Sequence, residues 1–521
     1  MSRSLNNTLQ LCMFFLLMLI CIFAFSLRIF DLGNNPPGFF ADEASVGLNA
    51  YTIANYGTDE YGKRLPLFFQ AFGEYKNPIP IYATVPFVWI FGLSVFSVRL
   101  TSVVLSILTI GMIYVLTKEI TRILPLSYVT ALLAALLLAI SPWHIHISRI
   151  SFEGFMPFLL CTMAGTYFFL RSFSVKWYLL LSAAFFGISL YTYFPARLFI
   201  PFFVIGLSVI YAKKLLRHLP VLFISFCVGF IVMLPLLGSI MFDNGLSRWD
   251  QVSIFAHPPN DESIVKHITN NYMSHFSYAF LFSKGDIDMP GQFITRHSVR
   301  GFGELYLYQL PFLFVGIYGL YRKKQFQTLA VLLLWMTLYP IGSIFTEDTS
   351  AQATRSIIGV IPFQILTAIG IIAAFATVNR HHKVLAHILT ISITLCITVS
   401  IFLYTKAYFQ DYKYYASDFW GFQYGAEDIV NYFTAHEAEY DELVMAPEFN
   451  APHIFFDFFA PSSCHTCIIG LPHDTYDQNK KQLFAITEEY KKTRLTYDFE
   501  TKHTIFYPNH TVAFLIGEIV E

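Results

Sequence analysis

The stretch LQLCMFFLLMLICIFAFSL, residues 9–27, contains no charged side chain. An apolar run of this length is long enough to cross the roughly 30 Å hydrocarbon core of a bilayer as a helix. Arg3 precedes the run, and Ala24-Phe25-Ser26 faintly suggests a signal-peptide cleavage site. The run is longer than a typical signal-peptide core, however, so we expect an uncleaved first membrane helix.

The composition of the whole chain points to the same class of protein. Of its 521 residues, 55% are hydrophobic and only 13% are charged, whereas about 25% are charged in an average soluble domain. The formal net charge of -1 provides no basic field of the kind that nucleic-acid binding requires. We therefore expect an integral membrane protein that has membrane lipids, and no nucleic acid, among its partners.

Further apolar runs follow the first, and basic residues cluster in alternate gaps between them. By the positive-inside rule, the basic gaps are cytoplasmic. The further runs lie near 98–117, 126–143, 154–170, 177–193, 198–212, 219–240, 306–320, 327–345, 357–379 and 384–404. The gaps then expected on the external face are 28–97, 141–155, 192–197, 241–305, 346–356 and the tail from about 405.

One more apolar segment, IPIYATVPFVWIFGLSV at 79–95, would upset this alternation if it crossed the membrane. Pro80 and Pro86 interrupt it and Gly92 shortens it, so we expect a helix that lies in the outer interface. The predicted fold class is an all-α polytopic membrane protein with about eleven transmembrane helices and interfacial helices in the first external loop.

The C-terminal tail has a different pattern. Residues 421–440 have a helical period, DELVMAP and CIIGLP read as short strands, and TIFYPNHTVAFLIGEIV reads as a last strand. We therefore divide the chain into a polytopic domain, 1–404, which includes the first external loop, 28–97, and a small external α/β domain, 405–521. Within the tail, Cys464 and Cys467 form a C-x-x-C that could be a disulfide, half a metal site or chance.

The interiors of the spanning runs contain almost no ionisable residues, and His387 is the exception. Ion-coupled transport normally needs such groups at mid-membrane, so the candidates for chemistry are in the external loops. First among them is the acidic pair Asp42-Glu43 in PPGFFADEASVGLNAY, 36–51. One carboxylate could accept a proton from a hydroxyl while the other holds a metal, a lysine or a neighbouring loop. The alternative is a helix start, where acids are favoured by the helix dipole.

The loop SPWHIHISRISFEG, 141–154, adds Glu153 and two histidines. If the loop were a strand, His144 and His146 would face the same way and could hold a divalent metal, although two ligands do not make a site. Interfacial hydrogen bonding of the histidines is the competing interpretation.

Cationic side chains also occur at the outer ends of spans and in the external loops, against the prevailing basic bias. Arginine suits a bidentate grip on phosphate and lysine binds it as a point charge, although both also snorkel at membrane interfaces. The candidates are Lys76, Arg99, Arg149, Arg197 and Arg355, with Arg296 and Arg300 as weaker ones.

Several of these stretches resemble a known family. LRIFDLGNNPPGFFADEASVGLNAY, DEYGKRLPLFFQAFGEYKNPIPIY and FSVRLTS resemble the membrane glycosyltransferases related to dolichyl-phosphate-mannose protein mannosyltransferases, often called family 39. SPWHIHISRISFEG, YTYFPARLFIP and RHSVRGFGELYL are similar to bacterial phospholipid-carrier-dependent members. The likeness covers roughly residues 28–370.

The resemblance implies a GT-C type fold, a polyprenyl-phosphate sugar as donor, and transfer to an acceptor hydroxyl with inversion at the anomeric carbon. Asp42 would be the base, Glu43 its companion and Glu153 a second-loop acid. Lys76 departs from the related lipid A transferases, where an acid, a lysine and a proline are contiguous, because Tyr75 and Asn77 intervene here.

The resemblance also places the protein in a bacterial inner membrane with its active site toward the exterior. The acceptor could be a protein, a lipid or a glycan. Two other functions stay open from the residues: a lipid-linked sugar flippase or exporter, and a non-catalytic membrane scaffold whose tail binds partners.

Overall fold

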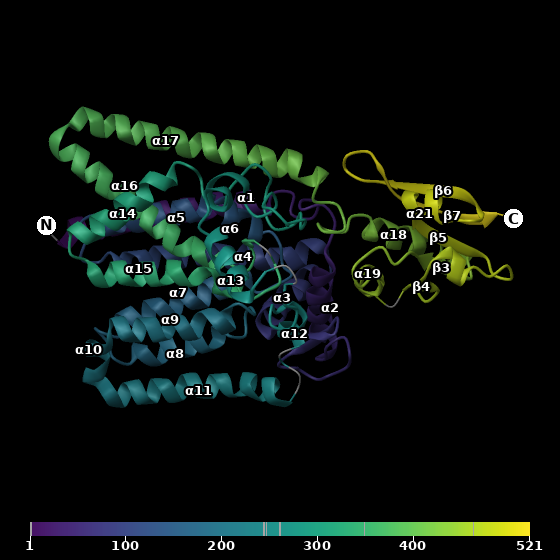
Figure 1. Cartoon of the computed structure of the whole chain (residues 1–521), viewed down its shortest axis with the longest axis horizontal. Helices are drawn as coiled ribbons and strands as arrows, with labels where there is room; N and C mark the ends of the chain where they lie inside the picture. Colours follow the sequence, from purple (N-terminus) through teal and green to yellow (C-terminus); the bar gives the residue numbers. More distant parts are fainter. Residues whose placement is uncertain are drawn as a thin grey trace.

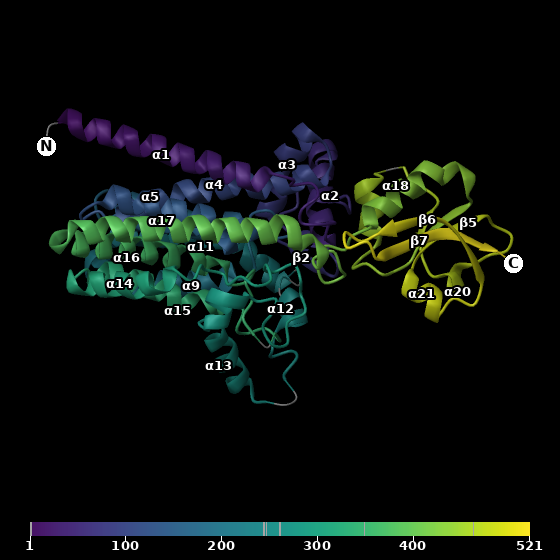
Figure 2. The same cartoon turned by 90° about the horizontal axis from the view of Figure 1, so that it is seen from above.

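A computed structural model describes residues 3–242, 245, 247–259, 262–348, 350–461 and 463–520. Figures 1 and 2 show an elongated molecule in which a helical bundle is followed by a smaller unit that contains the C-terminal sheet. The N-terminus, α10 (Ala212–Leu215) and the turn between α16 and α17 lie at one end of the bundle. α2, α3 and α12 lie at the opposite end, which faces the C-terminal unit and is called the α2 end below.

Each of the eleven predicted apolar runs contains a helix. Apolar helices satisfy their backbone hydrogen bonds internally, as the interior of a bilayer requires. The bounds are α1 Arg3–Ile29, α4 Val95–Ile120, α5 Ser127–Ile140, α7 Phe155–Arg171, α8 Tyr178–Ser189, α9 Ala196–Ile210, α11 Leu219–Phe242, α14 Gln309–Arg322, α15 Phe326–Leu338, α16 Val360–His381 and α17 Lys383–Lys406.

Length and composition allow five segments of the described chain to cross a membrane: those that contain α1, α4, α11, α16 and α17. The segment that contains α16 is the most deeply buried of the five, because 83% of its apolar 18-residue stretch lies inside the protein. The corresponding share for the segment that contains α17 is only 6%. The outward faces of α1 and α11 present large apolar side chains such as Leu11 and Phe223, which suit contact with lipid. The chain is an integral membrane protein, while the number of eleven crossings stays a prediction.

The first loop folds into two helices and a hairpin at the α2 end: α2 (Ala41–Tyr56), β1 (Phe69–Ala71), β2 (Glu74–Lys76) and α3 (Pro78–Phe91). The expected helix over 79–95 is present as α3, and its interfacial position stays a prediction. The acidic pair does begin a helix: both acids lie in the first turn of α2, where the helix dipole favours them, and the Glu43 side chain accepts from the backbone N–H of Phe40. The hairpin was not predicted.

The C-terminal unit contains a five-stranded sheet in the order β4-β3-β5-β7-β6. β3 pairs in parallel with β4 and β5, and β7 pairs antiparallel with β5 and β6. The elements are α18 Ala426–His436, β3 Glu442–Met445, α19 His453–Phe459, β4 Cys467–Ile469, α20 Pro472–Thr475, β5 Gln482–Thr487, α21 Glu488–Thr493, β6 Asp498–Phe506 and β7 Val512–Val520.

Three sequence expectations for the tail are confirmed and two need correction. The helix near 421–440 is α18, and DELVMAP and CIIGLP contain β3 and β4. The expected single last strand is a hairpin, because the turn at Pro508–His510 folds β7 back on β6, and β5 was missed. Cys464 and Cys467 are joined by a disulfide, which selects one of the three interpretations of the C-x-x-C.

The C-terminal unit packs directly against the first loop. One apolar core contains residues of α2 and α3 together with residues of α18, α19 and the sheet. Gly47 marks the closest approach, since a Cβ atom there would lie 2.5 Å from the Phe458 ring. The C-terminal unit is thereby tied to the loop that carries the acidic pair.

Candidate active site

A cavity of about 630 Å³ opens at the α2 end of the bundle. Each of the gaps that the basic pattern predicts to be external supplies a lining residue. From the first to the last gap these residues include Asp42, Glu153, Arg197, Arg248, Asp348 and Trp420. Chain segments far apart in sequence therefore converge on one pocket that contains both carboxylates and guanidinium groups.

Asp42 enters the cavity from the first turn of α2. Its side chain is 21% exposed, and its Oδ1 lies 2.8 Å from the Lys76 ammonium, which in turn lies 2.8 Å from Glu74. Glu74 also pairs with Arg248 at 3.2 Å. Glu74 and Lys76 are two residues apart on β2, so their side chains point to the same face of the hairpin. Both therefore take part in this chain of ion pairs.

The two cavity carboxylates differ electrostatically. Burial alone would raise the pKa of Asp42, but Lys76 outweighs burial and lowers it below the usual value. Burial raises the pKa of Glu153 to about 7, because Lys76 offsets only part of the desolvation and Glu74 adds like charge. Asp42 is thus ionised at neutral pH, whereas Glu153 can carry a proton.

Glu43 lies on the other side of α2, away from the cavity. Its side chain is fully buried, and Arg99 donates to both of its oxygens at 3.0 Å. The N–H of Ser151 donates to the same carboxylate at 3.1 Å. Of the adjacent pair, Asp42 faces the cavity and Glu43 locks the first loop to α4 and to the 148–154 loop.

Arg99 and Arg149, two of the predicted phosphate ligands, also hold the first loop. The remaining N–H groups of Arg99 reach the carbonyl oxygens of Pro36 and Gly38 at 2.8 Å. Arg149 donates to the carbonyl oxygens of Arg28 and Asn35 at 2.6 Å. Neither guanidinium lines the cavity, and we do not assign phosphate binding to them.

Lys76 is buried behind Asp42 and also does not line the cavity, so its direct contact is with the carboxylates. The other two predicted phosphate ligands, Arg197 and Arg355, do line it. Arg197 donates to Asn77 at 2.9 Å, and Arg355 pairs with Asp348 and donates to Thr346 at 2.7 Å.

Two more arginines complete the basic wall of the cavity. Arg296 stacks 3.9 Å from the centre of the Phe40 ring, beside the start of α2, and Arg248 lies on α12 (Ser247–Val252). Arg300, the other weaker candidate, pairs with Asp288 at 3.5 Å outside the cavity lining. Sequence reasoning missed Arg248, because it selected arginines such as Arg197 at the outer ends of spans, whereas Arg248 lies within the 241–305 gap.

The segment at His144 and His146 is not a strand, so the geometry required for a shared metal is not formed, and the competing interpretation of hydrogen-bonded histidines holds. Both lie on helix α6 (Pro142–Ile147), where residues two apart point in nearly opposite directions. His144 contacts Arg28 and Thr109 at 2.9 and 2.8 Å, while His146 contacts the carbonyl oxygen of Arg296 at 2.7 Å. Among the described residues, no three His, Cys, Asp or Glu side chains are grouped so that they could hold a metal ion.

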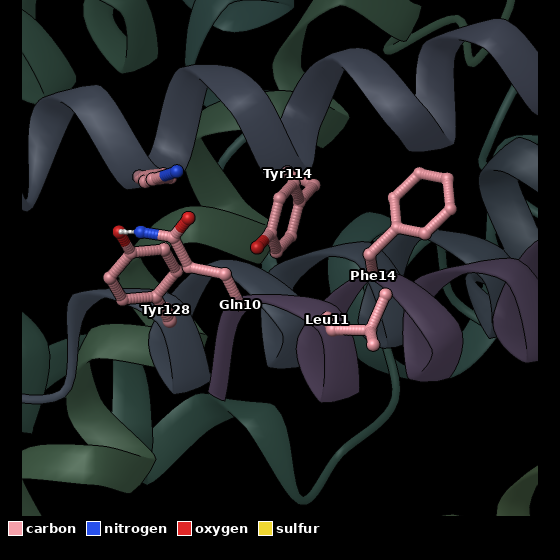
Figure 3. A pocket seen from close by; sticks show the side chains of 6 residues that line it. Gln10, Leu11, Phe14, Tyr114 and Tyr128 are labelled. Atoms are coloured by element: carbon pink, nitrogen blue, oxygen red, sulfur yellow. Dashed lines mark hydrogen bonds between the residues drawn. The ribbon is translucent and has the colours of Figure 1, made fainter. Parts of the chain in front are cut away.

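A second cavity, of about 450 Å³, lies between α1, α4 and α5 (Figure 3). Its lining includes Leu11, Phe14 and Tyr114, and Gln10 donates to the Tyr128 hydroxyl at 3.1 Å. Lys118 is its one charged side chain, and its ammonium lies 4.3 Å from the centre of the Tyr128 ring. This cavity is lined by neither a carboxylate nor an arginine, whereas the cavity at Asp42 has both, so the cavity at Asp42 is the candidate active site.

Part of the chain matches a known family. Residues 18–238, which include Asp42 and Glu153, match the model of the family described as dolichyl-phosphate-mannose-protein mannosyltransferase. This part of the chain matches the mannosyltransferase family. The resemblance found from the sequence is thereby confirmed over the matched residues. No curated protein sequence matches the chain.

Solved structures show that the mannosyltransferase-like region is part of a GT-C fold. The archaeal oligosaccharyltransferase AglB of Archaeoglobus fulgidus, in complex with an inhibitory peptide and a dolichol-phosphate, aligns with a TM-score of 0.57 and 13% identity. The alignment covers 96% of this chain and 74% of AglB. ArnT of Cupriavidus metallidurans, bound to undecaprenyl phosphate, aligns with a TM-score of 0.53 and 10% identity over 99% of this chain and 98% of ArnT. The predicted GT-C fold is confirmed.

Proposed function

We propose that this protein is a glycosyltransferase that moves a sugar from a polyprenyl-phosphate donor to an acceptor hydroxyl, with inversion at the anomeric carbon. One observation carries the proposal: the ionised Asp42 carboxylate shares a cavity with Arg197, Arg248, Arg296 and Arg355. The cavity thus offers a proton acceptor and a set of cations for a phosphate. The mannosyltransferase match over residues 18–238, which include Asp42 and Arg197, supports this chemistry.

In the proposed reaction, Asp42 accepts the proton of the acceptor hydroxyl as the oxygen attacks the anomeric carbon. The bond from that carbon to the phosphate oxygen breaks, and its electron pair remains on the phosphate. A positioned general base contributes about 10²–10⁴-fold to the rate, and fixed cations stabilise the charge that develops on the leaving phosphate. Lys76 holds the base in place and keeps it ionised.

The proposed setting is the external face of a bacterial inner membrane. The basic gaps lie at the end of the bundle opposite the cavity, which supports an external position of the cavity by the positive-inside rule. A lipid carrier supplies the activated sugar there, because its phosphate stays at headgroup depth. The proposed acceptor class is a hydroxyl of a protein, a lipid or a glycan.

The test is Asp42→Asn in membranes supplied with a radiolabelled polyprenyl-phosphate sugar. We expect transfer to fall at least about a hundredfold because the general base is lost, while the donor still binds. Asp457→Asn on α19, which is exposed and outside the cavity lining, is the matched control and should retain wild-type transfer. Unchanged transfer by Asp42→Asn would reject the base assignment, and movement of the donor across the membrane without transfer would support the flippase alternative.

A further inference from the structure

His297 is a cavity residue that the proposed mechanism does not yet use. It lies in the loop between η2 (Ala279–Lys284) and α14, next to Arg296, and it lines the cavity together with Arg296 and Arg355. Its side chain is only 7% exposed. The imidazole therefore stands on the basic side of the cavity, where the proposed mechanism places the donor phosphate.

A buried carboxylate lies directly behind this imidazole. Oδ2 of Asp286 is 3.2 Å from Nδ1 of His297, and the Asp286 side chain is 1% exposed. The Ser298 hydroxyl donates to Oδ1 of Asp286 at 2.9 Å, and the N–H of Ala353 donates to Oδ2 at 2.9 Å. Asp286 does not line the cavity, so its role is to position His297.

A fixed carboxylate at Nδ1 determines what the other ring nitrogen can do. It favours the tautomer with the proton on Nδ1, which leaves Nε2 free to accept a proton. Once protonated, the ring presents an Nε2–H donor while Asp286 stabilises the positive charge. In the free protein the two groups are within salt-bridge distance but are not aligned as a hydrogen bond, and such catalytic contacts are often poorly aligned in a free enzyme and tighten when the ligand binds.

The charges around His297 make its protonation sensitive to an anion in the cavity. Burial lowers the pKa of His297 below its ordinary value, Asp286 raises it, and Arg296 and Arg355 lower it further. The ring is therefore neutral at pH 7 in the free protein. A phosphate placed between these two arginines adds negative charge at the point where they disfavour the imidazolium, and so favours protonation.

We propose that His297, positioned by Asp286, takes up a proton when the donor phosphate binds and gives that proton to the leaving phosphate oxygen. This inference rests on the proposed function. The bond between the anomeric carbon and the phosphate oxygen breaks, the electron pair goes to that oxygen, and the oxygen takes the Nε2 proton. At the opposite side the acceptor oxygen bonds to the anomeric carbon and its proton goes to Asp42.

The step balances without any further reactant. The products are the glycosylated acceptor, a polyprenyl phosphate monoanion, neutral His297 and protonated Asp42. Asp42 then releases its proton to solvent, and His297 gains a proton from solvent when the next donor binds. His297 is thus a catalytic residue in this scheme, whereas Asp286 is a positioning residue.

The experiment measures proton uptake by calorimetry in buffers of different ionisation enthalpy. The probe is farnesyl methyl phosphate, a non-transferable diester whose single negative charge does not change between pH 5 and 8. We expect the full-length wild-type protein to take up close to one proton per diester bound at pH 7. Its affinity should rise as the pH falls, by up to about tenfold per pH unit, because binding and protonation are linked.

His297→Gln is the diagnostic variant, because glutamine can donate a hydrogen bond but does not titrate in this range. It should take up close to one proton less per diester bound than the wild type, and the pH dependence that remains belongs to Glu153, which lines the same cavity and has a pKa raised to about 7. Asp286→Asn should reduce the uptake at pH 7, since the imidazolium loses its stabilising carboxylate. Arg355→Gln is the control: it should weaken binding while proton uptake by the bound complex persists.

The outcomes separate this inference from the proposed function. Binding of the diester to the wild type without proton uptake would overturn the role of His297 and leave the donor class intact. Equal proton uptake by the wild type and His297→Gln would assign the proton to another group. No binding of the diester to the wild type at any pH would reject the polyprenyl-phosphate donor and, with it, this inference. If His297→Gln does not fold, Asp286→Asn decides the matter, because Asp286 lies against His297 and outside the cavity lining, so unchanged uptake in that variant would overturn the role of His297.

Discussion

Glu43 and Asp42 are neighbours in sequence, yet the fold gives them different tasks. Glu43 has no exposure and neutralises Arg99, whereas Asp42 keeps an open side toward the cavity. Adjacent positions on a helix differ by about 100° in direction, so one turn of α2 can reach both the loop core and the pocket. A precise position of Asp42 therefore depends on the buried pair behind it.

Arg99→Ala should destabilise the protein by about 3–5 kcal/mol, because it leaves the Glu43 carboxylate buried without its cation. Thermal unfolding of the purified protein in detergent measures the effect. Arg300→Ala is the matched control, since Arg300 is half-exposed and its carboxylate partner lies 3.5 Å away, and it should change stability by less than about 1 kcal/mol. Similar losses for both variants would mean that the Glu43–Arg99 pair does not anchor the loop.

Glu153→Gln should change how stability depends on pH. The folded-state pKa of Glu153 is raised to about 7, chiefly by burial, so in the wild type its contribution to stability is present at low pH. That contribution is lost as the pH rises through about 7. The glutamine variant should lack this loss and be more stable at pH 8 by on the order of 1–3 kcal/mol. Unfolding curves from pH 5 to 8 test this, and an unchanged pH slope in the variant would contradict it.

At the scale of elements, α2 joins the active-site loop to the C-terminal unit. Its inner face meets α19, and its first turn carries Asp42. Gly47 makes the contact close enough for the two helices to share one core, because there is no room for a side chain between the Phe458 ring and Val98.

Gly47→Ala should cost about 1–3 kcal/mol through overpacking, since its Cβ would lie 2.5 Å from Phe458 and 2.6 Å from Val98. Gly111→Ala in α4 is the matched control, because a Cβ there meets nothing within 4 Å and alanine favours a helix by up to about 1 kcal/mol. Limited proteolysis of the C-terminal unit and thermal unfolding both report the difference. A Gly47→Ala variant as stable as the control would show that α2 and α19 are not tightly docked.

The apolar helices were predictable from the sequence because a bilayer demands long runs of apolar residues, and each run near the predicted positions is a helix. The β1–β2 hairpin and β5 were missed, although β3 and β4, which are similarly short, were predicted. For strands this short, pairing and burial in the fold decide more than the local pattern which segments become strands. The role of each basic residue at the site could not be predicted from the sequence either. Arg99 and Arg197 look alike in sequence, and only tertiary contacts decide that Arg99 holds a loop while Arg197 faces the cavity.

At the scale of the whole molecule, the chain brings every predicted external gap to one end and every basic gap to the other. The cavity and the C-terminal unit share the α2 end (Figures 1 and 2). Transfer from a lipid carrier at the external face requires that this end lie outside the cytoplasm. The proposed transfer is therefore possible only if the bundle is oriented with its α2 end outside the cytoplasm.

Sided labelling of single cysteines tests this claim most directly. In a chain whose five free cysteines are replaced by alanine, Asn55→Cys on α2 and Lys492→Cys on α21 probe the α2 end, and Lys324→Cys probes the opposite end. We predict that a membrane-impermeant maleimide labels positions 55 and 492 in cells with a permeable outer membrane and an intact inner membrane. Position 324 should be labelled only after the inner membrane is opened. The reverse pattern, with position 55 protected and position 324 labelled, would place Asp42 in the cytoplasm and contradict the account.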